Sequence, residues 1–331
     1  MREPKFWAAD LDAWSRAAAP LTRTLLTPLS WLYAAVTARK IASTTPKRVT
    51  AKVICVGNLT AGGVGKSPIV AALRKRLREQ TEQRVATLSR GYGGRLKGPL
   101  QVNPNTHTST DVGDEPLMLA QDGESWIGAD RGLAGQAMSE AGVEIIVMDD
   151  GFQNPGLAKD LSLIVIDTAA KFGNGHVIPK GPLREPVPAG LKRADAIILV
   201  GDDPAPEALS GTSLPILRAK ITAISTPPAQ PYVAFAGIGR PEKLFDTLTD
   251  IGVDLLDAVP FPDHHVYRPG DLTYLSKLAE DHGAQLITTE KDFVRLSPDD
   301  RRDILTLPVE AVFEDTTKLD NLLASIMTSQ T

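Results

Sequence analysis

The stretch Gly57-Asn58-Leu59-Thr60-Ala61-Gly62-Gly63-Val64-Gly65-Lys66-Ser67 decides the fold of this 331-residue chain. It follows an apolar run at 52–56, which predicts a buried strand, and precedes an amphipathic run at 69–79, which predicts a helix. Glycines let backbone N–H groups approach a phosphate, and the first turn of a helix adds positive potential. This context predicts a nucleotide-binding phosphate loop, although a Gly-rich structural turn before a helix would have a similar pattern.

The last two residues of this loop have separate predicted roles. We expect Lys66 to reach the β- and γ-phosphates of a nucleotide and the Ser67 hydroxyl to bind Mg²⁺. Thr60 stands where the usual G-x-x-x-x-G-K-[ST] pattern has its first glycine. The predicted nucleotide-binding residues are Thr60, Ala61, Gly62, Gly63, Val64, Gly65, Lys66 and Ser67.

A pair of carboxylates follows another apolar run, at 144–148. Phosphate-loop proteins usually carry an acid against Mg²⁺ at the end of a neighbouring strand. Two adjacent carboxylates would be costly to bury without a cation. Asp149 and Asp150 are therefore predicted near the metal, the alternative being an Asp-Asp-Gly turn at the surface.

The rest of the chain alternates short apolar runs with amphipathic runs, which is typical of an α/β fold with mainly parallel strands. Strands are expected at 52–56, 84–88, 144–148, 161–166, 196–200, 232–236, 285–288 and 309–313. Helices are expected at 69–79, 115–121, 131–141, 241–251, 272–282 and 319–327. Three prolines within 225–231 predict a linker. We therefore expect a phosphate-loop domain at 49–224 and a smaller α/β domain at 225–331.

Composition excludes several classes of protein. A single cysteine, Cys55, excludes a disulfide framework and a cysteine zinc cluster. The net charge of −4 gives no basic field that would attract nucleic acid. Residues 1–48 carry +5 and three of the four tryptophans, which leaves −9 for the body. This basic, Trp-rich arm on an acidic body needs an explanation.

The arm, residues 1–48, has apolar residues at helical spacing. They are Trp7, Leu11, Trp14 and Ala18, followed by Leu25, Leu26, Leu29, Leu32 and Val36. Its longest charge-free run, 24–38, is too short and too polar for a membrane span, and a secretory signal is not expected. Trp favours the headgroup level of a bilayer and Lys/Arg favour anionic lipid. A pair of interfacial helices and a helical hairpin packed on the protein's own core both remain open.

Three further segments carry candidate functional groups. Asp114 and Glu115 stand where a helix begins, so they are either functional acids or simple N-terminal caps. His264 and His265 follow Asp263 on a predicted loop, where a histidine is either a candidate base or merely solvated. The basic, Pro-rich run at 179–186 suits a substrate-facing loop as well as a plain connector.

Taken together, these segments resemble the tetraacyldisaccharide 4'-kinases, the lipid A kinases of Gram-negative bacteria. The matching segments are 57–68, 89–93 (Ser-Arg-Gly-Tyr-Gly), 112–116 (Val-Gly-Asp-Glu-Pro), 149–153 (Asp-Asp-Gly-Phe-Gln), 179–186, 236–239, 263–264 and 288–292 (Thr-Thr-Glu-Lys-Asp). Their order and spacing run through nearly the whole chain, and the threonine at position 60 is part of the family's pattern.

The resemblance implies a reaction and a location. ATP with Mg²⁺ would donate its γ-phosphate to the 4'-hydroxyl of a tetraacylated glucosamine disaccharide 1-phosphate. The arm would dock on the cytoplasmic face of the inner membrane, where the lipid substrate lies. No obligate protein partner is evident. An alternative is a regulatory or partition-type ATPase, although the signature lysine of that loop is Ala61 here. A membrane-surface scaffold with a degenerate nucleotide site is a third hypothesis.

The resemblance also assigns site residues. Asp114 with His264 would form the base dyad, and Lys66 would neutralise the phosphates. Arg184 and Glu185 are expected contacts at the nucleotide or sugar end. The groups expected around Mg²⁺ are Ser67, Asp149, Asp150 and Glu115. His265 leaves the choice of histidine open, and His264 is preferred because it directly follows the motif's aspartate. Domain closure could then bring Asp114 and His264 together over the substrate.

Overall fold

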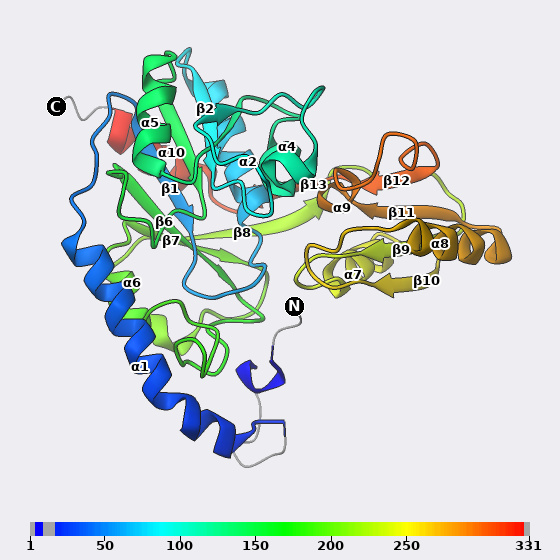
Figure 1. The fold of residues 1–331 in the computed structure, drawn as a ribbon, viewed down its shortest axis with the longest axis horizontal. Helices are drawn as coiled ribbons and strands as arrows, with labels where there is room; N and C mark the ends of the chain where they lie inside the picture. The colour runs from blue at the N-terminus through cyan, green and yellow to red at the C-terminus, as the bar shows by residue number, and fades with distance from the viewer. Residues whose placement is uncertain (1–3, 9–16, 328–331) are drawn as a thin grey trace.

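A computed structural model describes residues 4–8 and 17–327. Within them, nine strands form one sheet in the order β13-β8-β7-β6-β1-β5-β2-β4-β3 (Figure 1). Its strands are β1 (Lys52–Gly57), β2 (Val85–Ser89), β3 (Leu100–Gln101), β4 (Ser125–Ile127), β5 (Ile145–Asp149), β6 (Leu161–Asp167), β7 (Ala196–Val200), β8 (Ile216–Ala223) and β13 (Val309–Phe313). All neighbouring pairs are parallel except β13 with β8 and β3 with β4. The expected α/β fold with a mainly parallel sheet is confirmed.

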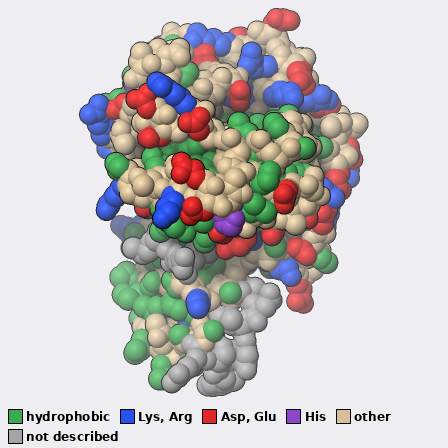
Figure 2. Space-filling view, turned by 90° about the vertical axis from the view of Figure 1, so that its right-hand side faces the viewer, with side chains coloured by type: hydrophobic (Ala, Val, Ile, Leu, Met, Phe, Trp, Pro, Cys, Tyr) green, Lys and Arg blue, Asp and Glu red, His purple; other side chains and the backbone are tan. Residues whose placement is uncertain are grey.

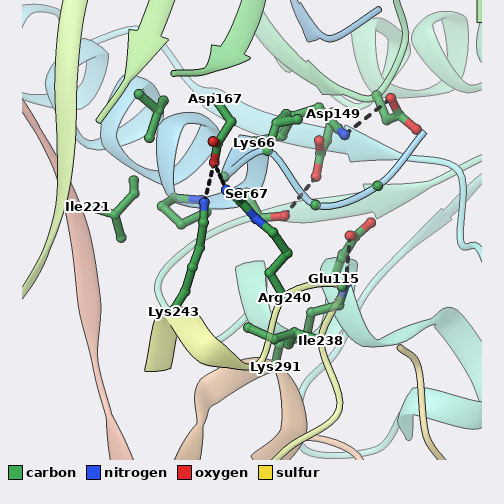
Figure 3. A pocket seen from close by; sticks show the side chains of 18 of the residues that line it. Lys66, Ser67, Glu115, Asp149, Asp167, Ile221, Ile238, Arg240, Lys243 and Lys291 are labelled. Atoms are coloured by element: carbon green, nitrogen blue, oxygen red, sulfur yellow. Dashed lines mark hydrogen bonds and ion pairs between the residues drawn. The ribbon is translucent and has the colours of Figure 1, made fainter. Parts of the chain in front are cut away.

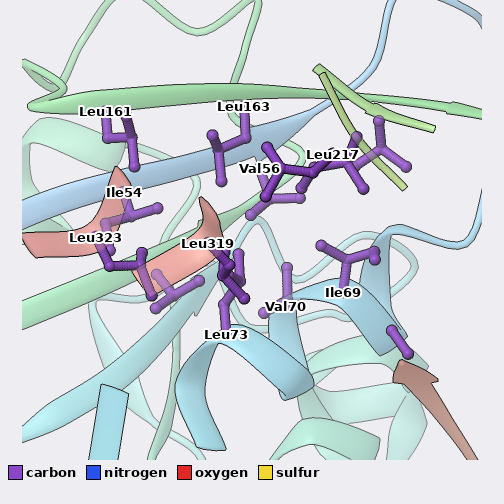
Figure 4. Close-up of a cluster of buried hydrophobic side chains, with 14 of the residues drawn as sticks. Ile54, Val56, Ile69, Val70, Leu73, Leu161, Leu163, Leu217, Leu319 and Leu323 are labelled. Carbon is purple, nitrogen blue, oxygen red and sulfur yellow. The ribbon is translucent and has the colours of Figure 1, made fainter. Parts of the chain in front are cut away.

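The central strands are apolar along their whole length because helices cover both faces of the sheet. On one face, α2 (Lys66–Gln80) and α10 (Thr316–Met327) pack their apolar sides against β1 and β6. Figure 4 shows Ile69, Val70 and Leu73 of α2 meeting Leu319 and Leu323 of α10 beneath the strands. The other face packs against α5 (Arg131–Glu140) and α6 (Val187–Leu191).

A second sheet of four parallel strands follows in the described chain, in the order β10-β9-β11-β12. Its elements are β9 (Tyr232–Ala236), α7 (Glu242–Asp250), β10 (Leu255–Pro260), α8 (Pro269–His282), β11 (Gln285–Thr289), α9 (Glu290–Phe293) and β12 (Ile304–Leu307). Side chains alternate across β9, so Tyr232 and Ala234 pack with α7 while Val233 and Phe235 pack with α8. We call residues 232–307 the small lobe and the part built on the nine-stranded sheet the large lobe.

The end of the chain departs from the expectation of a smaller domain running to residue 331. β13 pairs antiparallel with β8, and α10 packs in the core of the large lobe. The physical reason is that α10 buries Leu319, Leu323 and Ile326 against strands of the large sheet. Residues 225–231, the expected linker, join β8 to β9 and therefore connect the two sheets.

Among its described residues, the N-terminal arm has a long helix, α1 (Pro20–Ser43), and a short 3-10 helix at Lys5–Trp7. Ser30 is buried and fastens α1 to the body, because its Oγ donates to the Val177 carbonyl at 2.8 Å and accepts from the Lys180 N–H at 3.1 Å. Trp7 donates from Nε1 to the Pro179 carbonyl at 3.1 Å. The expected helical spacing through Leu11 and Trp14 falls outside the described residues.

The outer side of α1 is apolar and exposed, and the helix projects beyond the large lobe (Figure 1). The exposed side chains are Leu21, Leu25, Leu29, Trp31, Leu32, Tyr33 and Val36. Figure 2 shows hydrophobic side chains gathered on this projecting part, below the body of the molecule. None of the helices in the described chain combines the length and apolar character needed to cross a membrane.

Candidate active site

The phosphate loop connects β1 to α2, as its sequence predicts. Gly62 and Gly65 have φ of 106° and 83°, the left-handed region that glycine adopts without strain. Gly65 directly precedes α2, so the loop backbone ends at the positive end of that helix. Residues 61–67 line a cavity of about 1500 Å³. Thr60 is buried beneath the loop, where its carbonyl accepts from Asn58 Nδ2 at 2.8 Å.

The carboxyl ends of three adjacent parallel strands meet beside this loop. β1 lies between β5 and β6, so Gly57, Asp149 and Asp167 end their strands at the same edge of the sheet. Asp149 is paired in register with Val56 and is 2% exposed. Its Oδ2 accepts from the Ser67 hydroxyl at 3.5 Å. A surface turn at Asp149 is therefore excluded.

Asp149 has the properties of a metal ligand. Its Oδ1 is buried and has no hydrogen-bond partner among the described residues. Burial, and then the nearby Glu115 carboxylate, raise the pKa of Asp149 to about 7. A buried carboxylate oxygen without a donor is costly unless a cation meets it. Ser67 and Asp149 therefore fit a Mg²⁺ ion, which usually takes one or two carboxylates together with water and substrate phosphates.

Asp150, unlike Asp149, is paired with two cationic side chains. It adopts a left-handed φ of 51°, and its carboxylate lies between two cations. Arg184 donates from Nη1 to both carboxylate oxygens, at 2.8 and 3.0 Å, and Lys66 Nζ lies 3.6 Å from Oδ1. Burial opposes ionisation of Asp150, but Lys66 and Arg184 outweigh it and lower its pKa. Asp150 thus holds the phosphate-loop lysine and Arg184 in place.

The two residues expected at the nucleotide or sugar end are separated by the structure. Arg184 lines the cavity. Glu185 is 4% exposed, is not among the lining residues, and pairs with Arg193 at 2.6 Å. It also accepts from Gln153 Nε2, which in turn donates to the Asn58 carbonyl, at 3.0 and 2.9 Å. The geometry therefore gives Glu185 a supporting position behind the loop, not a direct contact in the cavity.

Two residues at the start of α4 (Asp114–Leu119) reach across to the small lobe. Asp114 Oδ2 lies 2.8 Å from Nδ1 of His264, and Glu115 Oε1 accepts from Lys291 Nζ at 3.0 Å. Asp114 is buried, so simple capping by an exposed carboxylate is excluded. Burial opposes ionisation of Asp114, but His264, Lys291 and Arg295 together hold its pKa well below its usual range.

The choice between the two histidines is settled by their partners. His264 pairs with Asp114 and lines the cavity, and its ring centroid lies 5.3 Å from that of Tyr92. His265 pairs instead with Asp271 of α8 at 3.0 Å and stacks on Phe261. The structure therefore pairs Asp114 with His264, the histidine preferred from the sequence, and His265 is half-buried against other side chains of the small lobe.

Sequence reasoning missed two groups of charged residues. Asp167 binds Arg240 and Lys243 of the small lobe (Figure 3), and Arg295 binds Asp114. A signal for Asp167 was present, because it directly follows the strand predicted at 161–166, and the structure pairs that strand with the phosphate-loop strand. Arg295 has no such signal, since its partner lies 181 positions away.

The cavity joins these parts into one site. Its walls come from the phosphate loop, the ends of β5 and β6, the small lobe and α1. Figure 3 shows side chains of both lobes pointing into it, with Lys66, Ser67 and Asp149 from one lobe facing Arg240, Lys243 and Lys291 of the other. The lining residues from α1 are Tyr33, Val36, Thr37 and Lys40.

Comparisons with known proteins agree with this arrangement. The family model described as "Tetraacyldisaccharide-1-P 4'-kinase" matches residues 22–328. A tetraacyldisaccharide 4'-kinase of Hyphomonas neptunium is 58% identical over 326 residues, covering 98% of each chain. One from Maricaulis maris is 48% identical, covering 99% of this chain and 97% of its own.

The fold has also been seen experimentally. A crystal structure of LpxK from Aquifex aeolicus in complex with ATP is 25% identical, with a TM-score of 0.73 over 92% of this chain and 99% of the other. Each of these matches covers more than nine-tenths of the chain. The chain belongs to the tetraacyldisaccharide-1-P 4'-kinase family.

Proposed function

We propose that this protein is an ATP-dependent lipid kinase that phosphorylates the 4'-hydroxyl of a tetraacylated glucosamine disaccharide 1-phosphate. One observation carries the proposal: a phosphate loop, a histidine–carboxylate pair and an exposed apolar helix border the same cavity. A phosphate donor, a hydroxyl acceptor and acyl chains each need one of these three parts. The names of the curated relatives and the ATP bound to the related crystal structure support it.

The phosphate loop is the proposed site for the ATP polyphosphate. Its backbone N–H groups and the start of α2 supply partial positive charge, and Lys66 adds a full one. Asn58 Oδ1, at 3.3 Å, and Asp150 hold the Lys66 ammonium in position before any nucleotide arrives. This pre-organisation favours transfer because the cation need not be recruited from solvent.

Ser67 and Asp149 are the proposed Mg²⁺ ligands, with Glu115 close enough to act directly or through water. When bound, Mg²⁺ would neutralise charge that develops on the β- and γ-phosphate oxygens. Asp150 was also expected near the metal, but Arg184 already occupies both of its oxygens. We therefore assign Asp150 to holding Lys66 and Arg184. Glu115 pairs with Lys291 and would have to leave it to contact the metal.

The hydroxyl proton is proposed to go to His264. An ionised Asp114 can only accept hydrogen bonds, so His264 Nδ1 must donate to it, and the Nε2 lone pair remains for the substrate. The side chain of His264 is 33% exposed and lines the cavity, whereas that of Asp114 is 7% exposed and does not. Asp114 would then stabilise the imidazolium that forms. The developing alkoxide attacks the γ-phosphorus while the bond from that phosphorus to the bridging β-phosphate oxygen breaks, and ADP leaves.

The acyl chains and the membrane are proposed to meet α1. Its apolar outer side is contiguous with Tyr33 and Val36 in the cavity wall, so chains lying along α1 would leave the sugar inside the cavity. The net charge of +5 in the arm favours an anionic bilayer surface. We propose that the protein works at the cytoplasmic face of the inner membrane, held there by this helix.

A transfer assay tests the proposal. Purified protein is incubated with γ-labelled ATP, Mg²⁺ and the lipid disaccharide 1-phosphate in detergent micelles, and the position of the new phosphate is read by phosphorus NMR. We expect labelled lipid bearing a 4'-phosphate, and no product with Lys66→Ala. ATP hydrolysis without labelled lipid would contradict the proposal and favour a nucleotide-driven regulatory ATPase.

A further inference from the structure

A buried ion-pair cluster lies directly behind Asp114, and the proposed phosphoryl transfer makes no use of it. Its members are Asp292 and Arg295, which follow β11 in the small lobe. The Asp292 side chain is fully buried and that of Arg295 is 6% exposed. Burying two charged groups is costly, so their arrangement calls for a reason.

Asp292 is held rigidly by four side-chain and backbone donors. Its Oδ1 accepts from the Gly237 N–H at 3.0 Å, from the Tyr267 hydroxyl at 2.8 Å and from Arg295 Nη1 at 2.7 Å. Its Oδ2 accepts from the Thr289 hydroxyl at 2.6 Å. These donors come from three separate segments of the small lobe, so Asp292 is a fixed anchor for the guanidinium.

Arg295 links Asp292 of the small lobe to Asp114 of the large lobe. Its Nη1 binds Asp292 and the Gly237 carbonyl, the latter at 2.7 Å, while Nε and Nη2 both bind Asp114 Oδ2, Nε at 2.8 Å. The planar guanidinium therefore has one edge fixed in its own lobe and presents the other edge to Asp114. A lysine ammonium lacks this fork and could not hold both edges at once.

Asp114 Oδ2 is consequently shared by Arg295 and His264. Its Oδ1 accepts from the Glu115 backbone N–H at 2.9 Å, so both carboxylate oxygens are occupied. We propose that Arg295 is a positioning residue for proton transfer, holding the Asp114 carboxylate so that His264 Nδ1 stays bonded to it and Nε2 faces the cavity. This inference rests on the proposed role of His264 as proton acceptor.

The charged surroundings of the pair predict how Arg295 acts on it. Asp114 faces Arg295, Lys291 and its neighbour Glu115, and His264 faces Asp114, Asp263 and Tyr92. Removing the Arg295 cation would strengthen the pull of Asp114 on a protonated imidazole. A protonated imidazole cannot accept the hydroxyl proton, so this stronger pull opposes the transfer. The acid limb of the rate–pH profile should therefore move to higher pH.

The test compares Arg295→Gln with Arg301→Gln in the lipid-phosphorylation assay. Arg301 lies in the same segment and is also structural, because it donates to the Phe293 and Val294 carbonyls, but none of its contacts reaches Asp114. We expect Arg295→Gln to lower kcat about 10- to 100-fold with the KM for ATP within about threefold, part of the 10²–10⁴ that a general base supplies. The acid limb should move upward by about one pH unit, and Arg301→Gln should show neither effect.

If Arg295→Gln does not fold, the lysine variants Arg295→Lys and Arg301→Lys provide the test. Arg295→Lys keeps the buried charge, so we expect the acid limb of the wild-type profile with kcat still at least tenfold low; Arg301→Lys is its control. An unmoved acid limb in Arg295→Gln, or a kcat for Arg295→Lys no lower than for Arg301→Lys, would overturn the inference. Failure of the proposed function is distinguishable, because the wild-type protein would then transfer no phosphate to lipid.

Discussion

His264 Nδ1 lies 2.8 Å from Asp114 Oδ2, although the two residues are 150 positions apart and belong to different lobes. The bond joins the carboxylate that begins α4 to a loop after β10. Lys291 with Glu115 and Arg240 with Asp167 cross the same boundary. The site is therefore a product of how the two lobes meet.

Asp149 should make the metal-free protein less stable as pH rises. Its pKa in the folded protein, about 7, lies above the ordinary value of 3.8. Between these two pH values the folded protein keeps the Asp149 proton, whereas the unfolded chain releases it. Stability contributed by the protonated group is therefore lost as pH rises through about 7. In EDTA, we expect Asp149→Asn to melt higher than wild type at pH 8, by a smaller margin at pH 5.5, and close to it only near pH 4.

The exposed Asp299 provides the control, since Asp299→Asn should follow wild type at each of these pH values. Mg²⁺ at pH 8 should raise the melting temperature of wild type and leave that of Asp149→Asn unchanged. Parallel melting curves for wild type and Asp149→Asn at every pH, measured by scanning calorimetry, would exclude the assigned role of Asp149.

Asp167 should stabilise the junction between the lobes. Burial opposes its ionisation, but Lys243, the Ala170 N–H and Arg240 outweigh it and lower its pKa. This stability is present above the ordinary pKa near 4 and is lost as pH falls through the lowered value. Asp167→Asn leaves two cations without their carboxylate, so urea unfolding at pH 7 should show a loss of about 1–3 kcal/mol.

Asp202 offers a matched comparison for that measurement. It pairs with Lys220 on the surface, with a side chain that is 75% exposed. Surface pairs contribute at most about 1 kcal/mol, so Asp202→Asn should change the free energy of unfolding little. Equal losses of unfolding free energy for Asp167→Asn and Asp202→Asn would mean that the buried Asp167 ion pairs stabilise the protein no more than a surface pair does.

The apolar side of α1 should bind lipid. Leu25 and Leu32 are exposed and make no contribution to the core clusters of the described chain. Burying a leucine in an apolar phase is worth about 1.5–3 kcal/mol. The double variant Leu25→Ser with Leu32→Ser should therefore lower recovery on anionic liposomes at least tenfold in sedimentation assays, with ATP binding unchanged.

Exposed leucines elsewhere control for general loss of hydrophobicity. Leu133 on α5 and Leu256 on β10 lie away from α1, and replacing both with serine should leave liposome binding unchanged. If both double variants bind liposomes as wild type does, α1 is not the membrane-facing element.

Local patterns predicted much of the large lobe. Runs such as 161–166 and 196–200 are apolar throughout because both faces of their strands are buried, and this signal needs no knowledge of partners. β8 was not predicted, since only one side of it is well covered and polar residues interrupt its apolar residues. β4 has three residues, too few to form a pattern.

The site residues likewise fall into those that a local pattern predicts and those that depend on long-range packing. Lys66, Ser67 and Asp149 follow from a loop and from strand ends, whose meeting at one sheet edge is a general property of parallel sheets. The membership of β13 in the large sheet and the contact of Arg295 with Asp114 depend on long-range packing, which no local pattern encodes. The pairing of Asp114 with His264 was reached through the family resemblance, not through spacing.

The most direct test of the account is the rate of phosphate transfer in a single turnover with His264→Ala and His265→Ala. Both histidines are adjacent in the chain, but His264 faces the cavity and His265 pairs with Asp271. We predict that His264→Ala slows transfer to lipid by about 10²–10⁴ while retaining ATP binding, and that His265→Ala stays within about tenfold of wild type. A near-normal rate for His264→Ala would contradict the account.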